Sequence, residues 1–125
     1  GLAVRDAMHH GIVTCPPTAS LREIAELLSE HRVHCAVVAD RAETGTVWGI
    51  VSDLDLMRGL GSTVALTAGN LAALDVITVG PDDELGHAAQ LMAEHDAAHL
   101  IVAAGGEPVG ILSTLDVARA VASGA

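Results

Sequence analysis

Two short segments of the chain share the spacing Ser-x-x-Asp, and each directly follows a run of apolar residues. The first is Ser52 with Asp55, and the second is Ser113 with Asp116. A serine before a helix can cap it, and an acidic residue three positions later completes a capping box. The same helix start directs free N–H groups at an anion, and a carboxylate there can accept two hydrogen bonds from a cis-diol. The pattern therefore predicts either a purely structural cap or a site for a ligand that carries a diol and a phosphate.

These two segments occupy equivalent positions in an internal repeat. Residues 12–38 match residues 76–102 at an offset of 64, and residues 49–55 match residues 110–116 at an offset of 61. The offset shortens within a loop, which we place at 40–46 in the first copy. Self-similarity at a fixed period indicates two copies of one structural unit.

Each copy predicts the order strand, helix, strand, hairpin loop, strand, helix. In the first copy the strands are predicted at 12–15, 35–39 and 47–51. Ser20 with Glu23 is a capping box that opens the first helix, and the second helix begins at Ser52 or Asp53. Strands that are apolar on both faces need helices over the sheet. The expected fold class is α/β (α+β), with two pseudo-symmetric β-α-β-β-α repeats packed sheet against sheet as one module.

Composition excludes several classes of protein. The chain has 125 residues, of which half are hydrophobic and 18% are charged, so it can form one compact ordered module. Its six basic residues, all arginines, face 16 acids at a net charge of −10, which excludes a basic surface for nucleic acid. The longest uncharged stretch, 59–74, is too short and too polar to span a bilayer. We expect no nucleic-acid or membrane partner, and the lack of a signal-peptide pattern makes a cytoplasmic location the expectation.

The cysteines and histidines raise the question of a metal site. His31, His34 and Cys35 lie within five residues, and imidazole and thiolate are the usual zinc ligands. Neighbouring residues on a strand point to opposite faces, however, so His34 and Cys35 would diverge. We therefore expect no metal site, reduced thiols at Cys15 and Cys35, and a ligand-lining role for Cys35 and its equivalent His99.

Arg58 and Arg119 also occupy equivalent positions, each three residues after the aspartate of its Ser-x-x-Asp segment. Residues three apart share one face of a helix, so each arginine can pair with its aspartate, an interaction of about 0.2–0.5 kcal/mol. The alternative is that these arginines contact a phosphate or a second subunit. We favour the ion pair and keep both arginines as candidates.

The order of predicted elements resembles a tandem pair of CBS (cystathionine-β-synthase) domains. The residues that carry the resemblance are Gly-Ile-Val-Ser-Asp-Leu-Asp at 49–55 and Gly-Ile-Leu-Ser-Thr-Leu-Asp at 110–116, which close the third strand of each copy. The resemblance covers nearly the whole chain. It divides the chain into a first CBS repeat at 4–60, a linker at 61–69 and a second CBS repeat at 70–122.

The resemblance implies a non-catalytic regulatory module that binds AMP, ADP or ATP, or in some members S-adenosylmethionine, in clefts between the repeats. In such a module Asp55 and Asp116 would hold the ribose hydroxyls, while Ser52 and Ser113 would lie near the phosphates. Carried over by position, the residues that would border the base are Ile12, Val13, Thr14, Val76, Ile77 and Thr78. The remaining candidates for ligand binding are Thr114, Cys35, His99, Arg58 and Arg119.

No cofactor is required under this interpretation, because the adenine nucleotide is a regulatory ligand, taken up with or without magnesium. The expected partners are the nucleotide, a second copy in a homodimer, and a regulated protein that the sequence does not identify. No nucleophile–base pair or glycine-rich phosphate loop indicates an enzyme. Three alternatives stay open: a ligand-free scaffold for dimerisation or a partner, a regulatory fragment of a longer enzyme or transporter, and a metal-binding stress protein.

The two Ser-x-x-Asp segments differ at the residue after the serine, which is Asp53 in the first and Thr114 in the second. A second carboxylate at a helix start repels phosphate, whereas a threonine can donate a hydrogen bond. We therefore expect the site at Ser113 and Asp116 to bind a phosphorylated ligand more tightly.

Overall fold

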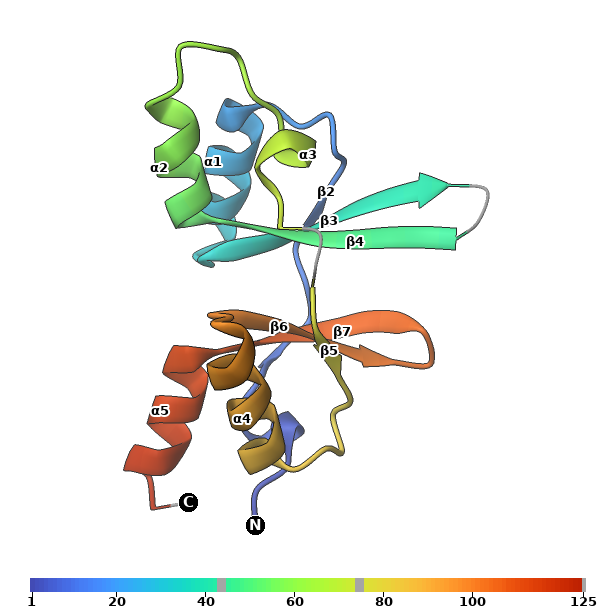
Figure 1. The fold of residues 1–125 in the computed structure, drawn as a ribbon, viewed down its shortest axis with the longest axis vertical. Coiled ribbons are helices and arrows are strands. Elements are labelled where there is room, and N and C mark those ends of the chain that lie inside the picture. Colours follow the sequence, from blue (N-terminus) through green and yellow to red (C-terminus); the bar gives the residue numbers. More distant parts are fainter. Residues whose placement is uncertain (43–44, 74–75, 125) are drawn as a thin grey trace. The chain divides into compact units, whose positions relative to one another are not determined.

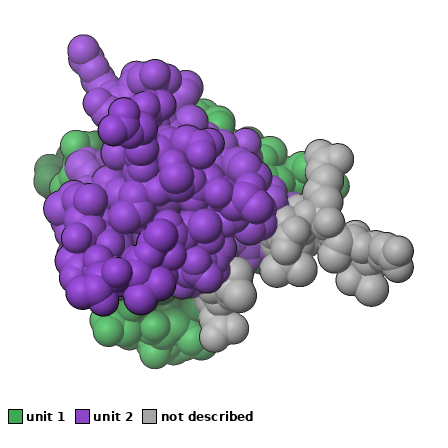
Figure 2. Space-filling model, turned by 90° about the horizontal axis from the view of Figure 1, so that it is seen from above, with its two compact units in different colours: residues 1–12, 77–125 green, residues 13–76 purple. Residues whose placement is uncertain are grey.

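The computed structural model describes residues 1–42, 45–73 and 76–124 of the chain, with side chains outside 40–47. These residues form two compact units (Figure 2). Unit 1 comprises residues 1–12 and 77–125, and unit 2 comprises residues 13–76. Each unit has its own sheet and helices (Figure 1), and each has its own hydrophobic core.

Unit 2 contains a three-stranded sheet of order β2-β3-β4, in which β2 runs parallel and β4 antiparallel to β3. Its elements are β2 (Thr14–Cys15), α1 (Leu21–His31), β3 (Cys35–Ala42), β4 (Gly45–Ser52), α2 (Asp53–Leu60) and α3 (Ala68–Leu71). The predicted capping box at the start of α1 is confirmed. Ser20 Oγ accepts the Glu23 N–H at 3.1 Å, and the Glu23 carboxylate accepts the Ser20 N–H at 3.3 Å.

The core of unit 2 lies between its sheet and the two longer helices. Ile24 of α1, Leu56 of α2 and Val51 of β4 are among its buried side chains. Gly59 lets α2 approach α1 closely, because a Cβ at this position would lie 2.8 Å from Leu21 Cδ2. The Leu21 side chain of α1 therefore packs directly against α2.

The hairpin of unit 2 is longer than predicted. We expected a connection over 40–46, whereas β3 continues to Ala42 and β4 starts at Gly45. The loop prediction was wrong for these residues because the hydrogen bonds of a strand ladder join backbone groups and can continue past the apolar run. Glu43 and Thr44, which belonged to the same prediction, lie outside the described residues.

The segment predicted as a linker, 61–69, enters a short helix before it ends. Ala68, the first residue of α3, is fully buried in the core of unit 2, and the Gly69 N–H donates to the Pro17 carbonyl at 2.8 Å. The division of the sequence into repeats stays a prediction, and in the structure the end of this segment packs with the first repeat.

Unit 1 contains a four-stranded sheet of order β1-β7-β6-β5. Its elements are the 3₁₀-helix η1 (Val4–Asp6), β1 (His9–His10), β5 (Thr78–Val79), α4 (Leu85–His95), β6 (His99–Ala104), β7 (Glu107–Ser113) and α5 (Thr114–Ala122). β5 runs parallel to β6, and β7 is antiparallel to both of its neighbours. The strand–helix order of the second repeat thus matches that of the first.

The first residues of the chain pack on the second repeat. Val4 is fully buried and donates its N–H to the Asp83 carbonyl at 2.8 Å. Arg5 forms an ion pair with Asp82, and the Gly11 N–H donates to the Val109 carbonyl at 2.8 Å. This explains why unit 1 combines the N-terminal segment with residues from the other end of the sequence.

Buried aliphatic side chains, with no Phe or Tyr in the chain, build the core of unit 1. Leu100, Val102 and Leu112 come from the two central strands and are completely buried, and Leu85 and Met92 of α4 cover them. In the described part of the chain, no helix is both long and apolar enough to cross a membrane.

Gly110 provides a test of the packing between β1 and β7. A Cβ at this position would overlap the His9 carbonyl oxygen and lie 2.5 Å from Met8 Cε. Gly110→Ala must displace β1, and we expect a loss of about 1–3 kcal/mol in the free energy of unfolding, measured by urea denaturation. The matched control is Gly86→Ala on α4, where nothing lies within 4 Å of the new Cβ; alanine there should be neutral or stabilising. Equal stability of the two variants would contradict this packing.

Candidate functional site

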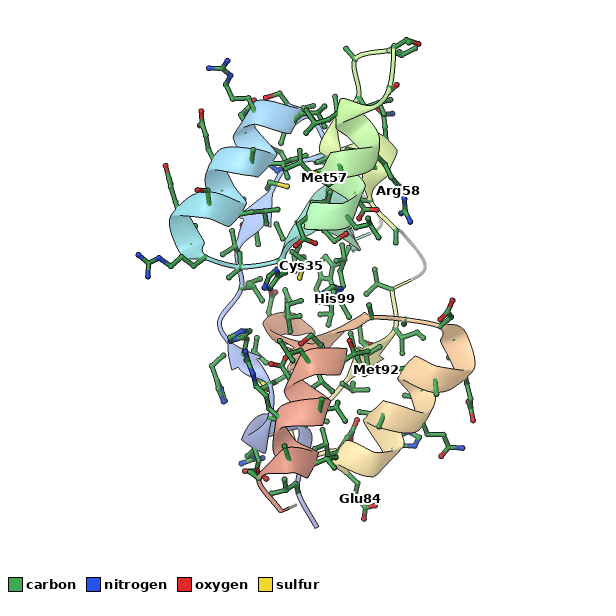
Figure 3. All side chains as sticks on the ribbon, turned by 90° about the vertical axis from the view of Figure 1, so that its left-hand side faces the viewer. Cys35, Met57, Arg58, Glu84, Met92 and His99 are labelled. Carbon is green, nitrogen blue, oxygen red and sulfur yellow. The ribbon has the colours of Figure 1, made fainter. Side chains whose placement is uncertain are left out.

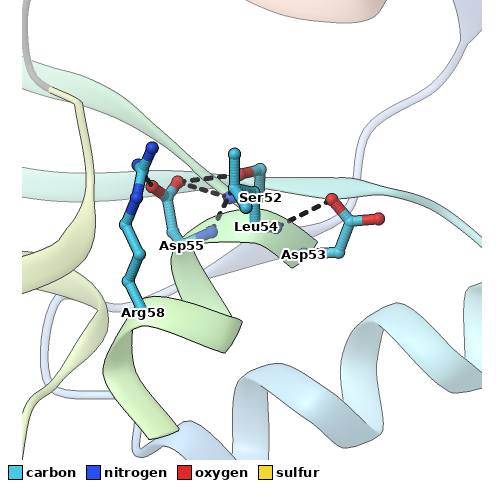
Figure 4. A network of polar contacts seen from close by, with 5 residues as sticks. All are labelled: Ser52, Asp53, Leu54, Asp55 and Arg58. Atoms are coloured by element: carbon cyan, nitrogen blue, oxygen red, sulfur yellow. Dashed lines mark hydrogen bonds and ion pairs between the residues drawn. The ribbon is translucent and has the colours of Figure 1, made fainter. Parts of the chain in front are cut away.

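The first Ser-x-x-Asp segment forms the junction between β4 and α2 (Figure 4). Asp55 Oδ2 accepts the Ser52 N–H at 2.8 Å and the Ser52 hydroxyl at 3.0 Å. In return, Ser52 Oγ accepts the Asp55 N–H at 3.2 Å. The structural capping role predicted for these residues is confirmed, and the cap holds the Asp55 carboxylate at the start of the helix.

Arg58 lies one turn further along α2. Its Nη1 donates to Asp55 Oδ1 at 3.2 Å, so the predicted ion pair within the helix is confirmed for this repeat (Figure 4). The Arg58 side chain is 67% exposed, and solvent screening makes an exposed pair of this kind weak. The guanidinium therefore keeps free donors for a second partner.

The second Ser-x-x-Asp segment joins β7 to α5 in the same way. Asp116 Oδ2 accepts the Ser113 N–H at 2.8 Å, and Ser113 Oγ accepts the Asp116 N–H at 3.1 Å. Asp116 is only 5% exposed, and among the described residues it is the one buried charged side chain. A buried polar group needs hydrogen-bond partners, and the capping bond provides one.

The ion pair that we expected between Arg119 and Asp116 does not form. Within the described residues, Arg119 is exposed and has no acidic partner. Both aspartates accept the N–H of their capping serine at 2.8 Å. They differ in burial: Asp116 is buried, whereas the Asp55 side chain is 17% exposed and lies within reach of Arg58. The two repeats thus hold their equivalent aspartates in different surroundings.

The residues after the two serines also differ in their contacts. Asp53 Oδ1 accepts the Leu54 N–H at 2.8 Å, and its Oδ2 lies 2.9 Å from Nδ1 of His34. At the equivalent positions, the second repeat has Thr114 and Ala98. The start of α2 therefore carries an additional carboxylate and imidazole that the start of α5 lacks.

Strand pairing brings further predicted residues beside the capping boxes. Cys35 is the register partner of Ser52, and His99 is the register partner of Ser113. Both Cys35 and His99 therefore lie on the strand adjacent to a capping serine, as their equivalence in the repeat implied. Whether they contact a ligand stays a prediction.

The residues predicted to border a base lie where the chain passes from one unit to the other. Ile12 ends the first segment of unit 1, and Val13 and Thr14 open unit 2; Val76 ends unit 2, and Ile77 and Thr78 follow in unit 1. The Val13 and Ile77 carbonyls accept backbone N–H groups of β3 and β6. Thr14 and Thr78 are exposed, so their hydroxyls remain available.

The positions of the described side chains do not support the alternative that the chain is a metal-binding protein. Among the described residues, no three side chains of His, Cys, Asp or Glu come together to hold an ion. Neither Cys15 nor Cys35 forms a disulfide, as predicted, and both are buried. Burial raises the pKa of the Cys15 thiol, and the Glu23 carboxylate raises it further, so Cys15 is a neutral thiol at pH 7.

Sequence reasoning missed a groove in unit 1, between α4 and α5. It has a volume of about 470 Å³, and alanines make up most of its lining, together with Met92, Asp96 and Thr114. The signal was present in the repeat: Ala97, Ala98 and Ala118 stand where the first copy has larger residues.

Comparison with known proteins agrees with this description of two equivalent repeats. The model of the CBS domain family matches the chain twice, over residues 4–62 and 68–123. The chain therefore belongs to the CBS domain family, and both the resemblance seen in the sequence and the α/β fold are confirmed. Among solved structures, a CBS domain protein from Pyrobaculum aerophilum complexed with AMP is 30% identical, with a TM-score of 0.79 over 98% of this chain and 99% of that protein.

This chain covers very different shares of the length of two curated relatives. CBS domain-containing protein YhcV of Bacillus subtilis (strain 168) is 26% identical over 119 residues, which cover 93% of this chain and 83% of YhcV. A homoserine O-acetyltransferase of Methanohalophilus mahii is 30% identical over 125 residues, which cover 98% of this chain. The chain spans only 25% of the length of that acetyltransferase.

The capping box of α5 predicts a loss of stability on mutation. Ser113→Ala removes the acceptor of the Asp116 N–H, and we expect the free energy of unfolding to fall by about 0.5–2 kcal/mol, measured by urea denaturation. Ser29→Ala, at an exposed position inside α1, is the matched control and should be at least as stable as the wild type, because alanine favours helix. If Ser113→Ala lost no more stability than this control, the cap would not hold the helix start.

Proposed function

We propose that this chain is a non-catalytic regulatory module that binds an adenosine nucleotide of the AMP, ADP or ATP type at its two Ser–Asp capping boxes. The observation that carries the proposal is the duplication of a fixed carboxylate at a helix start, with Asp55 on α2 and Asp116 on α5. Support also comes from the Pyrobaculum aerophilum relative, whose structure holds AMP. Binding would be signalled to a second copy of the chain or to a regulated protein.

The aspartates suit the ribose end of such a ligand. A carboxylate offers about four lone-pair sites, and the cap uses only part of this capacity at either residue. Asp116 Oδ2 accepts the Ser113 N–H, and its hydrogen bond fixes the direction of the whole group. The 2′- and 3′-hydroxyls of a ribose would donate to the remaining lone pairs, and the charge of the acceptor strengthens such bonds.

The starts of α2 and α5 could both bind the phosphate of the nucleotide, but we expect them to bind it with different affinity. At α2 the Leu54 N–H already donates to Asp53 Oδ1 at 2.8 Å. At α5, within the described residues, the equivalent Leu115 N–H has no acceptor. A free N–H near the positive end of a helix dipole attracts an anion, so a phosphate would bind more favourably at α5.

A second candidate role is that of a regulatory part of a longer protein. The observation that favours it is the match to the Methanohalophilus mahii acetyltransferase, of which this chain covers a quarter. In that case the nucleotide sites would stay the same, and the regulated protein would be joined to the module covalently. The full reading frame distinguishes this role from that of a stand-alone module.

We further propose that the chain forms a homodimer. Leu54, Met57 and Leu60 on α2 are 55–64% exposed, and Leu115 and Val121 on α5 are 50% and 63% exposed. The three-residue spacing of Leu54, Met57 and Leu60 places these side chains on one broad face of α2. Exposed apolar faces of this kind mark interaction sites, and a second copy carries the same faces.

Removing both ribose acceptors tests the proposed site. For Asp55→Asn together with Asp116→Asn, we expect AMP affinity to fall about 10- to 150-fold at each site, since a charged hydrogen bond contributes about 1.5–3 kcal/mol. Isothermal titration calorimetry measures the affinity. Glu26→Gln with Glu30→Gln is the matched control, because it removes the same two charges from exposed positions of α1. Affinity equal to this control in the aspartate double variant, with folding verified by circular dichroism, would refute the site.

Titration of single variants with AMP should also distinguish the two binding sites. In metal-free buffer, Asp116→Asn should abolish the tighter AMP event, and Asp55→Asn the weaker one. Asp53→Thr should tighten the weaker event several-fold, because a like charge about 6 Å from a phosphate costs about 1 kcal/mol with partial screening. Magnesium should narrow the difference by bridging Asp53 and the phosphates. The opposite order of affinities would contradict the electrostatic explanation even if AMP binds.

A further inference from the structure

Both oxygens of the Asp55 carboxylate accept hydrogen bonds in the structure. Oδ2 accepts the Ser52 N–H at 2.8 Å and the Ser52 hydroxyl at 3.0 Å. Oδ1 accepts Nη1 of Arg58 at 3.2 Å. Because a carboxylate has about four lone-pair sites, two on each oxygen, Oδ2 is fully used and Oδ1 keeps room for about one more donor.

The equivalent carboxylate of Asp116 has fewer partners. Within the described residues it accepts a single hydrogen bond, from the Ser113 N–H to Oδ2 at 2.8 Å. Arg119 stands where the first repeat has Arg58, and it makes no ion pair in this part of the chain. Asp116 therefore keeps about three lone-pair sites, so the two aspartates differ in how many further donors they can accept.

This difference matters for a ribose, because its 2′- and 3′-hydroxyls are two donors. Asp116 can accept both hydroxyls and keep its bond to the serine. Asp55 can accept one of them, and the second has to displace a donor that is already bound. The bonds from Ser52 belong to the cap at the start of α2, and their loss would destabilise the helix.

Arg58 is the donor of Asp55 that can leave at the lowest cost. Its side chain lies at the surface beside α2 and is 67% exposed (Figure 3), so water can hydrate the guanidinium once it leaves the carboxylate. Exposed ion pairs between residues three apart on a helix contribute little to stability. A ribose that binds through both hydroxyls would therefore exchange the Arg58 bond for one of its own.

We propose that Arg58 competes with the ribose for Asp55 and thereby lowers the preference of the site at α2 for a ribose over a deoxyribose. This inference rests on the nucleotide function proposed above and adds a specificity-determining residue to one of its two sites. Arg58 acts through Asp55, so it is a positioning residue and not a ligand contact. The repulsion by Asp53 acts on the phosphate, whereas the competition by Arg58 acts on the sugar.

Comparison of AMP with 2′-deoxy-AMP and 3′-deoxy-AMP tests the competition, because each analogue lacks one hydroxyl and leaves Arg58 in place. In Asp116→Asn, which keeps the site at α2, the preference for AMP over each analogue should rise about 1.4- to 5-fold when Arg58→Met is added. This factor corresponds to the loss of an exposed ion pair. Isothermal titration calorimetry measures the affinities. Any direct effect of the lost charge on the phosphate is common to the three ligands and cancels in the ratio.

Two matched variants control the measurement. Arg58→Lys keeps a cation and a donor three residues after Asp55, and it should return the preference for AMP to that of the arginine. Arg22→Met removes the same charge from an exposed position of α1 and should leave the preference unchanged. A purely structural role of Arg58 would change the affinity for the three ligands alike and leave their ratio as it is.

The site at α5 provides the reference for a carboxylate without a competitor. In Asp55→Asn, which keeps this site, each analogue should bind about 10- to 150-fold more weakly than AMP, since each lacks one bond to a charged acceptor. If Asp116→Asn fails to fold, the weaker of the two binding events in the chain with Asp116 intact gives the same comparison for Arg58→Met.

The competition is overturned if Arg58→Met leaves the preference for AMP unchanged or lowers it, or if the site at α2 binds no AMP while the site at α5 does. Equal weakening of all three ligands would show that Arg58 contacts the phosphate, and the nucleotide function would stand. A wild-type chain that binds AMP at neither site overturns the proposed function and this inference together.

Discussion

In each unit, reciprocal hydrogen bonds between a serine and the aspartate three residues later hold a carboxylate at the junction of a strand and a helix. They determine where α2 and α5 begin and which way Asp55 and Asp116 point. Because the serine ends a strand and the aspartate opens a helix, the same bonds join each sheet to its helix. A nucleotide that used these carboxylates would bind the folded chain and not the unfolded one, so binding would stabilise the fold by mass action.

The two units use this shared junction differently. In unit 2 it is surrounded by charge, with Arg58 on one side of Asp55 and the His34–Asp53 pair on the other. In unit 1 the capping box contributes one acidic side chain, the buried Asp116. The neutral residues Thr114 and Ala98 stand there in place of Asp53 and His34. The repeats have thus diverged in charge at the helix starts and in side-chain volume along the helices, while the backbone order stays the same.

Local patterns allowed much of this arrangement to be predicted. The capping boxes at Ser20, Ser52 and Ser113 form as expected, since their hydrogen bonds connect residues only three positions apart. The order of strands and helices followed from the apolar runs and from the internal repeat. Placing Cys35 and His99 beside the capping serines needed only the equivalence of the two repeats, and strand register agrees with it.

Features that depend on distant parts of the chain could not be predicted. Nothing near Val4 in the sequence shows that it is buried in the core of the second repeat, because its partner Asp83 lies far along the chain. The missing ion pair of Arg119 accompanies the burial of Asp116, which depends on the packing of the whole unit. The groove becomes evident only when α4 and α5 are placed side by side, although the alanines that create it were visible in the repeat.

The most direct test of the proposed nucleotide site is an experimental structure of the chain with AMP. We predict ribose hydroxyls within hydrogen-bonding distance, about 2.5–3.0 Å, of the Asp116 or Asp55 carboxylate, and the phosphate at the start of the corresponding helix. Occupancy should be higher at Asp116, where the helix start carries no second carboxylate. AMP bound in the groove between α4 and α5, or at any place where neither aspartate contacts the ribose, would contradict the role assigned to the capping boxes.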